Sequence, residues 1–338
     1  MDSRRISPFQ PDQVLVVIPT LNEARHIADC LRSLILEDPF GRAVTCVVAD
    51  GGSTDGTQDI VTRIAAGHRG LHLMHNPDRL QSAGINAAIR QHRDPQHALL
   101  VRCDAHAAYP PNYIQQVVTA FADQPEAASV ATVMDAMGTG CFQRASAWVV
   151  DTPLGAGGSA HRGGTWSGWV DHGHHAGMRL EMFEHIGGYD PGFSHNEDAE
   201  YDHRLRLAGG RVWLAADIRL GYQMRPTPRQ LWRQYWNYGR GRARTLRKHH
   251  MRPRLRQVIP VINLILLGLS ALCGLIWPVA WLWVGSYLTI LLVVSAFACI
   301  RLRSPCGLWA GPALAIIHNA WGGGLLRQLL GKRGAGQP

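Results

Sequence analysis

One stretch of the sequence constrains this chain more than any other: no charged residue occurs between Val258 and Ile300. The stretch covers 43 positions, whereas a membrane-spanning helix needs about 20 predominantly apolar residues. Trp277-Pro278 lies near its middle, and proline cannot continue a helix. The stretch therefore predicts two membrane-spanning helices that form a hairpin, and it makes the membrane a partner of the protein.

The residues before this hairpin are strongly basic. Ten arginines and one lysine occur between Arg225 and Arg256, with no Asp or Glu. Such a block indicates either nucleic acid or an anionic membrane surface, and its place beside a membrane span favours the cytoplasmic face of the membrane. Residues 229–246 combine arginines with aromatic side chains, which is typical of a helix in the headgroup plane. We therefore expect no nucleic-acid partner.

The N-terminal residues and the cysteines indicate the same compartment. Met1 to Gln13 contains no apolar core of a signal peptide, so we expect the residues before the hairpin to stay in the cytoplasm, attached to a bacterial-type inner (plasma) membrane. The chain has seven cysteines but no Cys-x-x-Cys pair. This usage suits a reducing compartment and argues against structural zinc or a disulfide framework.

Between residues 13 and 224, short apolar runs alternate with segments of helical periodicity. Val14 to Ile18 and Val44 to Ala49 are apolar runs, typical of strands that are buried on both faces. Strands that alternate with helices predict an α/β fold, a parallel sheet with helices on both faces. Further strands are expected at 71–74, 98–103, 129–134 and 211–215, and helices at 23–36, 58–66, 82–90, 113–121, 177–186 and 197–208.

Two segments carry weaker signals. Residues 138–177 are rich in glycine and resemble a loop. Residues 308–326 are apolar but contain Pro312, His318 and Asn319, so a third span, a re-entrant segment and a surface helix all remain open. The expected domains are an N-terminal tail (1–12), the α/β domain (13–224), a basic juxtamembrane segment (225–257), the hairpin (258–300), and a third apolar segment with the C-terminal tail (301–338).

Acidic residues follow two of the predicted strands. Ligands bind at the carboxyl ends of the strands in such sheets, and Asp50 and Asp104 lie at two of these ends. Asp104 and His106 are two positions apart, on one side of an extended backbone, and could offer an oxygen and a nitrogen to a divalent cation. The alternative is an aspartate that caps the following turn beside a solvated histidine.

Four motifs along the chain resemble those of one enzyme family. In order, they are Pro19-Thr20-Leu21-Asn22-Glu23, Asp50-Gly51-Gly52-Ser53-Thr54-Asp55, the strand end at Asp104, and Glu197-Asp198. Over residues 13–245 they resemble the family 2 glycosyltransferases, which are inverting enzymes with the GT-A fold. Arg102 to Pro110, Gln234 to Arg242 and the membrane hairpin look most like the ExoA-type succinoglycan glycosyltransferases. The resemblance implies a mixed, mostly parallel sheet flanked by helices, with C-terminal membrane helices.

The resemblance also implies a binding site for a nucleotide-sugar donor. Relatives place an aspartate such as Asp50 against the base; the alternative is a turn aspartate in a glycine-rich loop. Thr20, Asn22 and Glu23 would line the nucleoside pocket, or simply cap the first helix. The expected donor-binding residues are Pro19, Thr20, Asn22, Glu23, Asp50, Gly51, Ser53, Asp55, Asn86, Arg102, Asp104, Arg240 and Arg242.

Two parts of this donor site depart from the family pattern. The resemblance implies that Asp104 and His106 hold a cation, Mn²⁺ or Mg²⁺, that bridges the two phosphates. Most relatives carry Asp-x-Asp here, so His106 favours a borderline ion such as Mn²⁺. Arg240 and Arg242 resemble the place where processive relatives carry a Gln-x-x-Arg-Trp motif. The strict motif is absent, and contact with phospholipid is the alternative role for both arginines.

Asp198 is the candidate general base, with Glu197 beside it. A neighbouring like charge tends to raise the pKa of a carboxylate toward a useful range, and inversion needs one such base. The alternative is simple capping of a helix that begins with acidic residues. His172, His174 and His175 suggest zinc, but adjacent residues of a strand diverge and no partner ligand lies near in the sequence. We expect them to be loop histidines near an acceptor site or in solvent.

Together these features predict a membrane-anchored inverting glycosyltransferase. It would move a hexose from a nucleotide sugar, such as a UDP-sugar, to a lipid-linked oligosaccharide in exopolysaccharide biosynthesis, within a polysaccharide synthesis complex. Two alternatives remain open at this point. One is a transferase that makes polyprenyl-phosphate sugars, and the other is a non-catalytic subunit that binds nucleotide or glycan.

Overall fold

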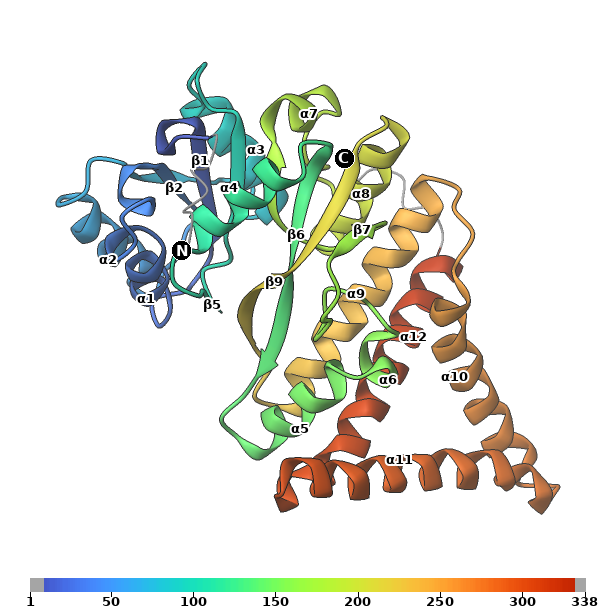
Figure 1. The fold of residues 1–338 in the computed structure, drawn as a ribbon. Coiled ribbons are helices and arrows are strands. Elements are labelled where there is room, and N and C mark those ends of the chain that lie inside the picture. The colour runs from blue at the N-terminus through green and yellow to red at the C-terminus, as the bar shows by residue number, and fades with distance from the viewer. Residues whose placement is uncertain (1–8, 332–338) are drawn as a thin grey trace. The chain divides into compact units, whose positions relative to one another are not determined.

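The computed structural model describes residues 9–331 (Figure 1). These residues form two compact units, one made of 9–134 and 164–222 and the other of 135–163 and 223–331. Most of the expected N-terminal tail and the last residues of the expected C-terminal tail lie outside the described residues.

A mixed sheet organises the first unit. Its strands are β1 (Val14–Thr20), β2 (Thr45–Asp50), β3 (Leu71–His75), β4 (Leu99–Arg102), β5 (Ala107–Ala108), β6 (Ala127–Met137), β7 (Gly168–Val170), β8 (His174–Arg179) and β9 (Arg211–Gln223). The strand order is β3-β2-β1-β4-β8-β6-β9-β5, and β7 pairs with β9. β1 runs parallel to β2 and β4, whereas β8 runs antiparallel to β4 and β6. The sheet is therefore mixed, with a parallel part from β1 to β4, as in a GT-A fold.

The parallel pairing of β1, β2 and β4 brings their carboxyl ends to one edge of the sheet. Thr20 lies opposite Asp50, and Val17 opposite Arg102. Helices on both faces bury these strands, which explains why their sequences are apolar without alternation. The first-unit helices are α1 (Ile27–Leu31), α2 (Thr57–Ala65), α3 (Gln81–His92), α4 (Tyr113–Asp123), α7 (Leu180–His185) and α8 (Glu197–Leu207), with the 3₁₀ turns η1 (Pro11–Gln13) and η3 (Gly41–Ala43).

The structure differs from three sequence predictions. The expected loop at 138–177 contains a helix, α5 (Cys141–Val150), as well as β7 and β8. The glycines of this region flank α5 rather than interrupt it, so they did not prevent a helix. The first predicted helix is a short α1 followed by a π-helical turn, η2 (Arg32–Leu36). The expected helix at 177–186 begins as strand β8 and becomes helical only at Leu180.

The second unit is helical. Besides α5 it contains α6 (Pro153–Ala156), α9 (Pro228–Lys248), α10 (Leu255–Cys273), α11 (Trp281–Leu302) and α12 (Ala310–Leu330), with the turns η4 (Pro278–Ala280) and η5 (Pro305–Trp309). A Cβ on Gly239 of α9 would lie 2.1 Å from the Trp321 carbonyl oxygen of α12. A Cβ on Gly324 would lie 2.2 Å from the Trp236 carbonyl oxygen of α9. These glycines therefore permit direct contact between the two helix backbones.

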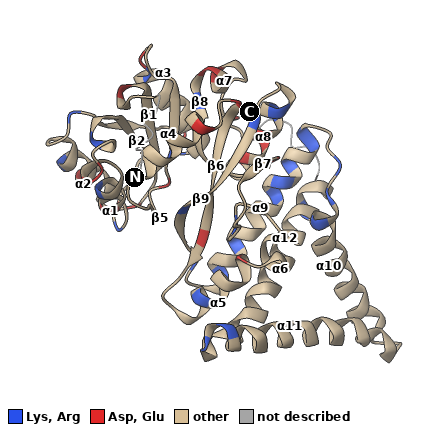
Figure 2. Ribbon diagram, viewed as in Figure 1, with Lys and Arg blue, Asp and Glu red and all other residues tan. Residues whose placement is uncertain are grey.

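Two helices among the described residues are long and apolar enough to cross a membrane. They cover Leu255–Cys273 and Pro278–Leu302, with mean hydropathies of 1.8 and 2.1. Figure 2 shows basic residues along α9, near the start of α10 and near the end of α11, with a long uncharged length between the last two. The third apolar segment forms α12, which packs against α9, α10 and α11.

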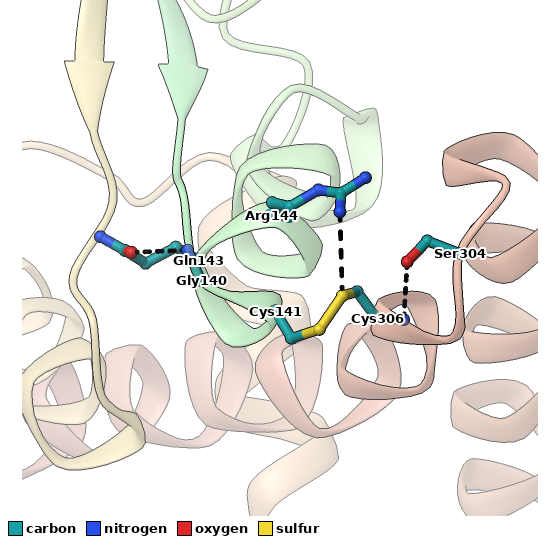
Figure 3. The surroundings of a disulfide bond; sticks show 6 residues. All are labelled: Gly140, Cys141, Gln143, Arg144, Ser304 and Cys306. Carbon is teal, nitrogen blue, oxygen red and sulfur yellow. Dashed lines mark hydrogen bonds between the residues drawn. A yellow bond between two sulfur atoms is a disulfide. The ribbon is translucent and has the colours of Figure 1, made fainter.

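A disulfide bond joins Cys141 at the start of α5 to Cys306 in η5 (Figure 3). This corrects the expectation from the cysteine pattern, because the two residues are 165 positions apart and spacing motifs report only local pairs. The backbone N–H of Cys306 donates to Ser304 Oγ at 3.3 Å, which fixes the turn that carries the sulfur. The bond lies wholly within the second unit.

Candidate active site

Two loops at the carboxyl ends of β1 and β2 are hydrogen-bonded to each other. Asn22, which has a φ of 56°, accepts from the Thr54 backbone N–H at 2.9 Å, while its own N–H donates to Ser53 Oγ at 2.8 Å. The N–H of Glu23 donates to Thr57 Oγ1 at 2.9 Å. The first two sequence motifs therefore form one rigid rim, in which Pro19, Thr20, Gly51 and Asp55 also lie.

Asp50, at the end of β2, is hydrogen-bonded to the loop that forms part of this rim. Its side chain is buried, and Oδ1 accepts from the backbone N–H groups of Gly52 and Ser53 at 2.9 Å and from Gln58 Nε2 at 2.7 Å. The Ser53 hydroxyl donates to the other carboxylate oxygen. This is the turn-aspartate role that the sequence left open, and in this structure Asp50 faces its own loop rather than an open pocket.

Asp104 follows β4 at the neighbouring strand end. Its backbone N–H is bonded to the Tyr109 hydroxyl, and Ala107 N donates to the Asp104 carbonyl at 3.1 Å, which turns the chain back after the strand. Burial opposes ionisation of Asp104, but Arg102, His174 and His106 outweigh it and lower the pKa of this carboxylate. Asp104 is therefore an anion placed at the edge of the sheet.

Two imidazoles lie near this edge, and only one was expected there. His106 Nδ1 is 2.9 Å from Glu23 Oε1, so the expected metal residue is paired with the first motif. His174 Nε2 is 3.7 Å from Asp104 Oδ2, although we expected it in a loop. Position on β8 explains this contact, since β8 is the antiparallel neighbour of β4. Within the described residues, no three metal-ligating side chains are close enough to enclose an ion by themselves.

Arg102 is an internal counter-ion rather than an exposed donor-binding residue. Its side chain is 4% exposed. Nη1 donates to Asp198 Oδ1, and Nη2 lies 3.4 Å from Asp104 Oδ1 and 3.9 Å from Glu197 Oε1. A buried arginine is stable only when its charge is paired in this way. Arg102 therefore joins the strand-end motif to the Glu-Asp motif.

Glu197 and Asp198 begin α8, and their two carboxylates differ in protonation. Burial and the neighbouring Asp198 raise the pKa of Glu197 to about 7. Burial also opposes ionisation of Asp198, but Arg102 and His175 hold the pKa of Asp198 well below its usual range. The sequence predicted a raised pKa for Asp198. That prediction is wrong, because the charged partners of Asp198 come from distant strands.

His175 and Asp202 belong to the same cluster, and sequence reasoning missed both roles. His175 Nε2 lies 2.6 Å from Asp202 Oδ1, and Nδ1 lies 2.6 Å from the Tyr189 hydroxyl and 3.3 Å from Asp198 Oδ1. His172 Nδ1 is 2.7 Å from Asp202 Oδ2. A signal was present in the spacing of Asp198 and Asp202, which are four positions apart and share one helix face.

The remaining predicted residues lie elsewhere. Asn86 accepts from the Tyr189 backbone N–H at 3.0 Å and donates to the Tyr189 carbonyl at 2.7 Å, so in this structure its amide fixes that loop. Arg240 and Arg242 are on α9 in the second unit, where Arg240 Nε donates to Gln328 Oε1 at 3.4 Å.

The fold and the ordered strand-end residues define a nucleotide-sugar transferase fold, and comparison with known proteins specifies the family. Residues 15–187 match the model of Glycosyl transferase family 2. The chain is 40% identical over 317 residues to the succinoglycan biosynthesis protein ExoA of Rhizobium meliloti strain 1021, covering 94% of each chain. This protein is therefore a family 2 glycosyltransferase.

Two further matches are more distant. A Methanococcus voltae enzyme, a dolichyl N-acetyl-alpha-D-glucosaminyl phosphate 3-beta-D-2,3-diacetamido-2,3-dideoxy-beta-D-glucuronosyltransferase, is 21% identical over 243 residues, or 70% of this chain and 74% of that enzyme. The solved mannosyltransferase PcManGT of Pyrobaculum calidifontis, in complex with GDP-Man and Mn²⁺, has a TM-score of 0.57 at 19% identity. The match covers 97% of this chain and 91% of that one, which confirms the GT-A fold.

Proposed function

We propose that this protein is an inverting transferase that moves a hexose from a nucleotide sugar, a UDP-sugar, to a lipid-linked oligosaccharide in exopolysaccharide biosynthesis. The observation that carries the proposal is the ionised Asp198 beside Arg102, at the sheet edge where Asp104 ends β4. The Asp198 carboxylate would take a proton, and the Asp104 carboxylate would face a diphosphate. The extensive match to a succinoglycan biosynthesis protein supports the exopolysaccharide pathway.

The donor would lie against the rim formed by the first two motifs. Asn22, Ser53 and Glu23 are fixed there by the bonds between the loops. Asp50 would act on the donor through the loop that it anchors. The amide and hydroxyl groups of this rim suit the polar edge of a nucleoside, and its rigidity lowers the entropy cost of binding.

The donor set at the sheet edge fits a divalent cation that also takes ligands from a diphosphate. Asp104 would supply a carboxylate oxygen and His106 an imidazole nitrogen, with the His174 nitrogen as a further donor close to Asp104. This mixture of oxygen and nitrogen favours Mn²⁺ over Mg²⁺. When bound, such an ion neutralises the charge that develops on the departing diphosphate.

Asp198 would serve as the general base. It would accept the proton of the acceptor hydroxyl while that oxygen forms a bond to the anomeric carbon. The bond from this carbon to the diphosphate oxygen breaks on the opposite face, so the nucleoside diphosphate leaves with the bonding electrons and the configuration inverts. Arg102 and His175 keep Asp198 deprotonated for this step. The neighbouring Glu197 has a pKa of about 7.

The second unit would hold the active unit against a membrane and a lipid-linked acceptor. α10 and α11 would cross the membrane as a hairpin, with the first unit and α9 on the cytoplasmic side of an inner membrane. The basic face of α9, with Arg240 and Arg242, would contact lipid or diphosphate groups. A polysaccharide synthesis complex would be the setting for this reaction.

A transferase that acts on polyprenyl phosphate itself is the second candidate. The Methanococcus voltae relative is named for transfer to dolichyl N-acetyl-alpha-D-glucosaminyl phosphate, a sugar that is already on the lipid phosphate, so its name supports a polyprenyl carrier but favours the first candidate over the second. The two candidates differ in the acceptor, since one elongates a glycan on the lipid and the other glycosylates the lipid phosphate. A non-catalytic subunit is disfavoured because both Asp104 and Asp198 are present.

One screen tests these alternatives. The full chain in phospholipid vesicles is incubated with Mn²⁺ and either UDP-glucose, UDP-galactose, GDP-mannose or UDP-N-acetylglucosamine. Each reaction receives polyprenyl phosphate or a polyprenyl diphosphate-linked sugar. We expect release of UDP and a longer glycan only with the lipid-linked sugar. Transfer to polyprenyl phosphate would favour the second candidate, and no turnover of any donor would contradict both.

A further inference from the structure

His175 lies between two carboxylates in the interior of the first unit. The residue is fully buried, with 0% of its surface exposed. Its Nε2 is 2.6 Å from Asp202 Oδ1, and its Nδ1 is 3.3 Å from Asp198 Oδ1. Each nitrogen of the ring therefore lies near one carboxylate, and the imidazole itself is closed to water.

Secondary structure fixes both ends of this bridge. Asp198 and Asp202 are one turn apart on α8, so their side chains leave the same face of the helix. His175 comes from β8, where its neighbour His174 points instead toward Asp104. Alternation along the strand thus gives the two histidines separate partners. The imidazole spans the gap between the carboxylates without a change in helix geometry.

Aromatic side chains keep the imidazole in this orientation. The ring of Tyr201 lies 5.1 Å from that of His175, at an interplanar angle of 75°. The Tyr189 hydroxyl is 2.6 Å from His175 Nδ1 and donates to Asp198 Oδ1 at 3.2 Å. The second oxygen of Asp202, Oδ2, lies 2.7 Å from His172 Nδ1 and accepts from the Gly173 N–H at 3.3 Å.

We infer that His175, backed by Asp202, is a positioning residue that sets the direction of the Asp198 carboxylate toward the acceptor. This inference rests on the proposed role of Asp198 as the base. Asp198 has one strong charged partner on the β4 side, Arg102, and one on the β8 side, His175. Arg102, the Tyr189 hydroxyl and His175 all contact the same oxygen, Asp198 Oδ1. Without the imidazole, Oδ1 is held by Arg102 and Tyr189 alone, and the other oxygen, Oδ2, leaves the line of the acceptor hydroxyl. A shift of about 1 Å at such a group costs on the order of 10²-fold in rate.

A double-mutant cycle separates this role from a structural one. Turnover is measured with the full chain in vesicles, Mn²⁺ and whichever of UDP-glucose and UDP-galactose is used faster, and donor affinity by titration with UDP. We expect His175→Gln to lower turnover on the order of 10²-fold, with the affinity for UDP unchanged within about threefold. In an Asp198→Asn background the same substitution should change turnover by less than about twofold.

One matched control and one further variant come from the same unit. His97 is also buried, at 2% exposed, but its Nδ1 accepts only from the nearby Asp94 N–H, so His97→Gln should keep full turnover. Asp202→Asn keeps the shape of the site and should lower turnover about tenfold, which tests the bridge if His175→Gln does not fold.

The outcomes are distinct. Equal losses from His175→Gln in both backgrounds would overturn the positioning role, because a structural histidine acts whether or not Asp198 is present. Normal turnover of Asp202→Asn would overturn the part of the inference that concerns Asp202. Normal turnover of Asp198→Asn alone would instead overturn the proposed base, and with it this inference.

Discussion

Arg102 and Asp198 are hydrogen-bonded across 96 positions of sequence, from Nη1 of the arginine to Oδ1 of the aspartate. The pair joins the end of β4 to the start of α8. Because Arg102 also contacts Asp104, one guanidinium connects the residue that would face the donor with the residue that would act on the acceptor. The two halves of the proposed reaction therefore depend on a single buried cation.

Replacing this cation should be costly to the fold. Arg102→Met leaves the carboxylates of Asp104, Glu197 and Asp198 without their shared partner, and breaking a buried pair in this way costs about 3–5 kcal/mol. Thermal unfolding of the variant in detergent should show this loss. Arg206→Met is the matched control, because Arg206 and Asp171 form an exposed pair at 3.5 Å that contributes at most about 1 kcal/mol. Equal destabilisation by both substitutions would contradict this account of Arg102.

Glu197 should make stability depend on pH in a defined direction. Its pKa is about 7 in the folded chain and about 4.3 when unfolded. Because the folded value is raised, the stability linked to this group is complete below the unfolded pKa and is lost as pH rises through about 7. Relative to Glu197→Gln, which is always neutral, the wild type should therefore lose Tm between pH 5 and 8. A constant Tm difference over that range would show that Glu197 is not shifted.

His106 should determine the choice of metal ion. Mg²⁺ prefers oxygen ligands in a strict octahedron, whereas Mn²⁺ accepts mixed nitrogen and oxygen ligands. We expect wild-type turnover to be greater with Mn²⁺, and His106→Asp to narrow or reverse that preference while it keeps activity. The measurement is a metal titration of turnover at saturating donor. The same Mn²⁺-to-Mg²⁺ ratio in both proteins would remove His106 from the metal shell and leave its pair with Glu23 as its role.

The proposed hairpin of α10 and α11 predicts which residues face the outside of the cell. Ile276 is exposed in the turn between α10 and α11. In a chain that keeps the Cys141–Cys306 disulfide and lacks the five other cysteines, Ile276→Cys should react with an impermeant maleimide in intact cells. Asp59→Cys on α2 should react only after the cells are opened. Labelling of the Asp59→Cys chain in intact cells would place the first unit outside and contradict the cytoplasmic orientation.

The sequence predicted the sheet and the order of the motifs well, for a physical reason. Strands buried on both faces must be apolar throughout, and an acidic residue directly after such a run, as at Asp50 and Asp104, marks the strand end. The helix α5 was missed because glycine-rich neighbours on both sides hid a short segment with good helix formers.

The electrostatics of the site could not be read from local sequence. The neighbour visible at Asp198 is Glu197, which suggests a raised pKa. The partners that decide the outcome, Arg102 and His175, come from two other strands and meet α8 only in the folded chain. Likewise, no local pattern indicates that the Asn86 amide is hydrogen-bonded to the backbone of Tyr189.

The base itself gives the most direct test of the account. Asp198→Asn removes the proton acceptor but keeps the shape of the side chain, so transfer should fall on the order of 10²-fold or more while the affinity for UDP stays unchanged. Asp190→Asn, a change to an aspartate that caps a nearby turn at Gly192, serves as the control and should retain most turnover. Near-normal transfer by Asp198→Asn, measured beside this control in the same vesicles, would contradict the assignment of Asp198 as the base.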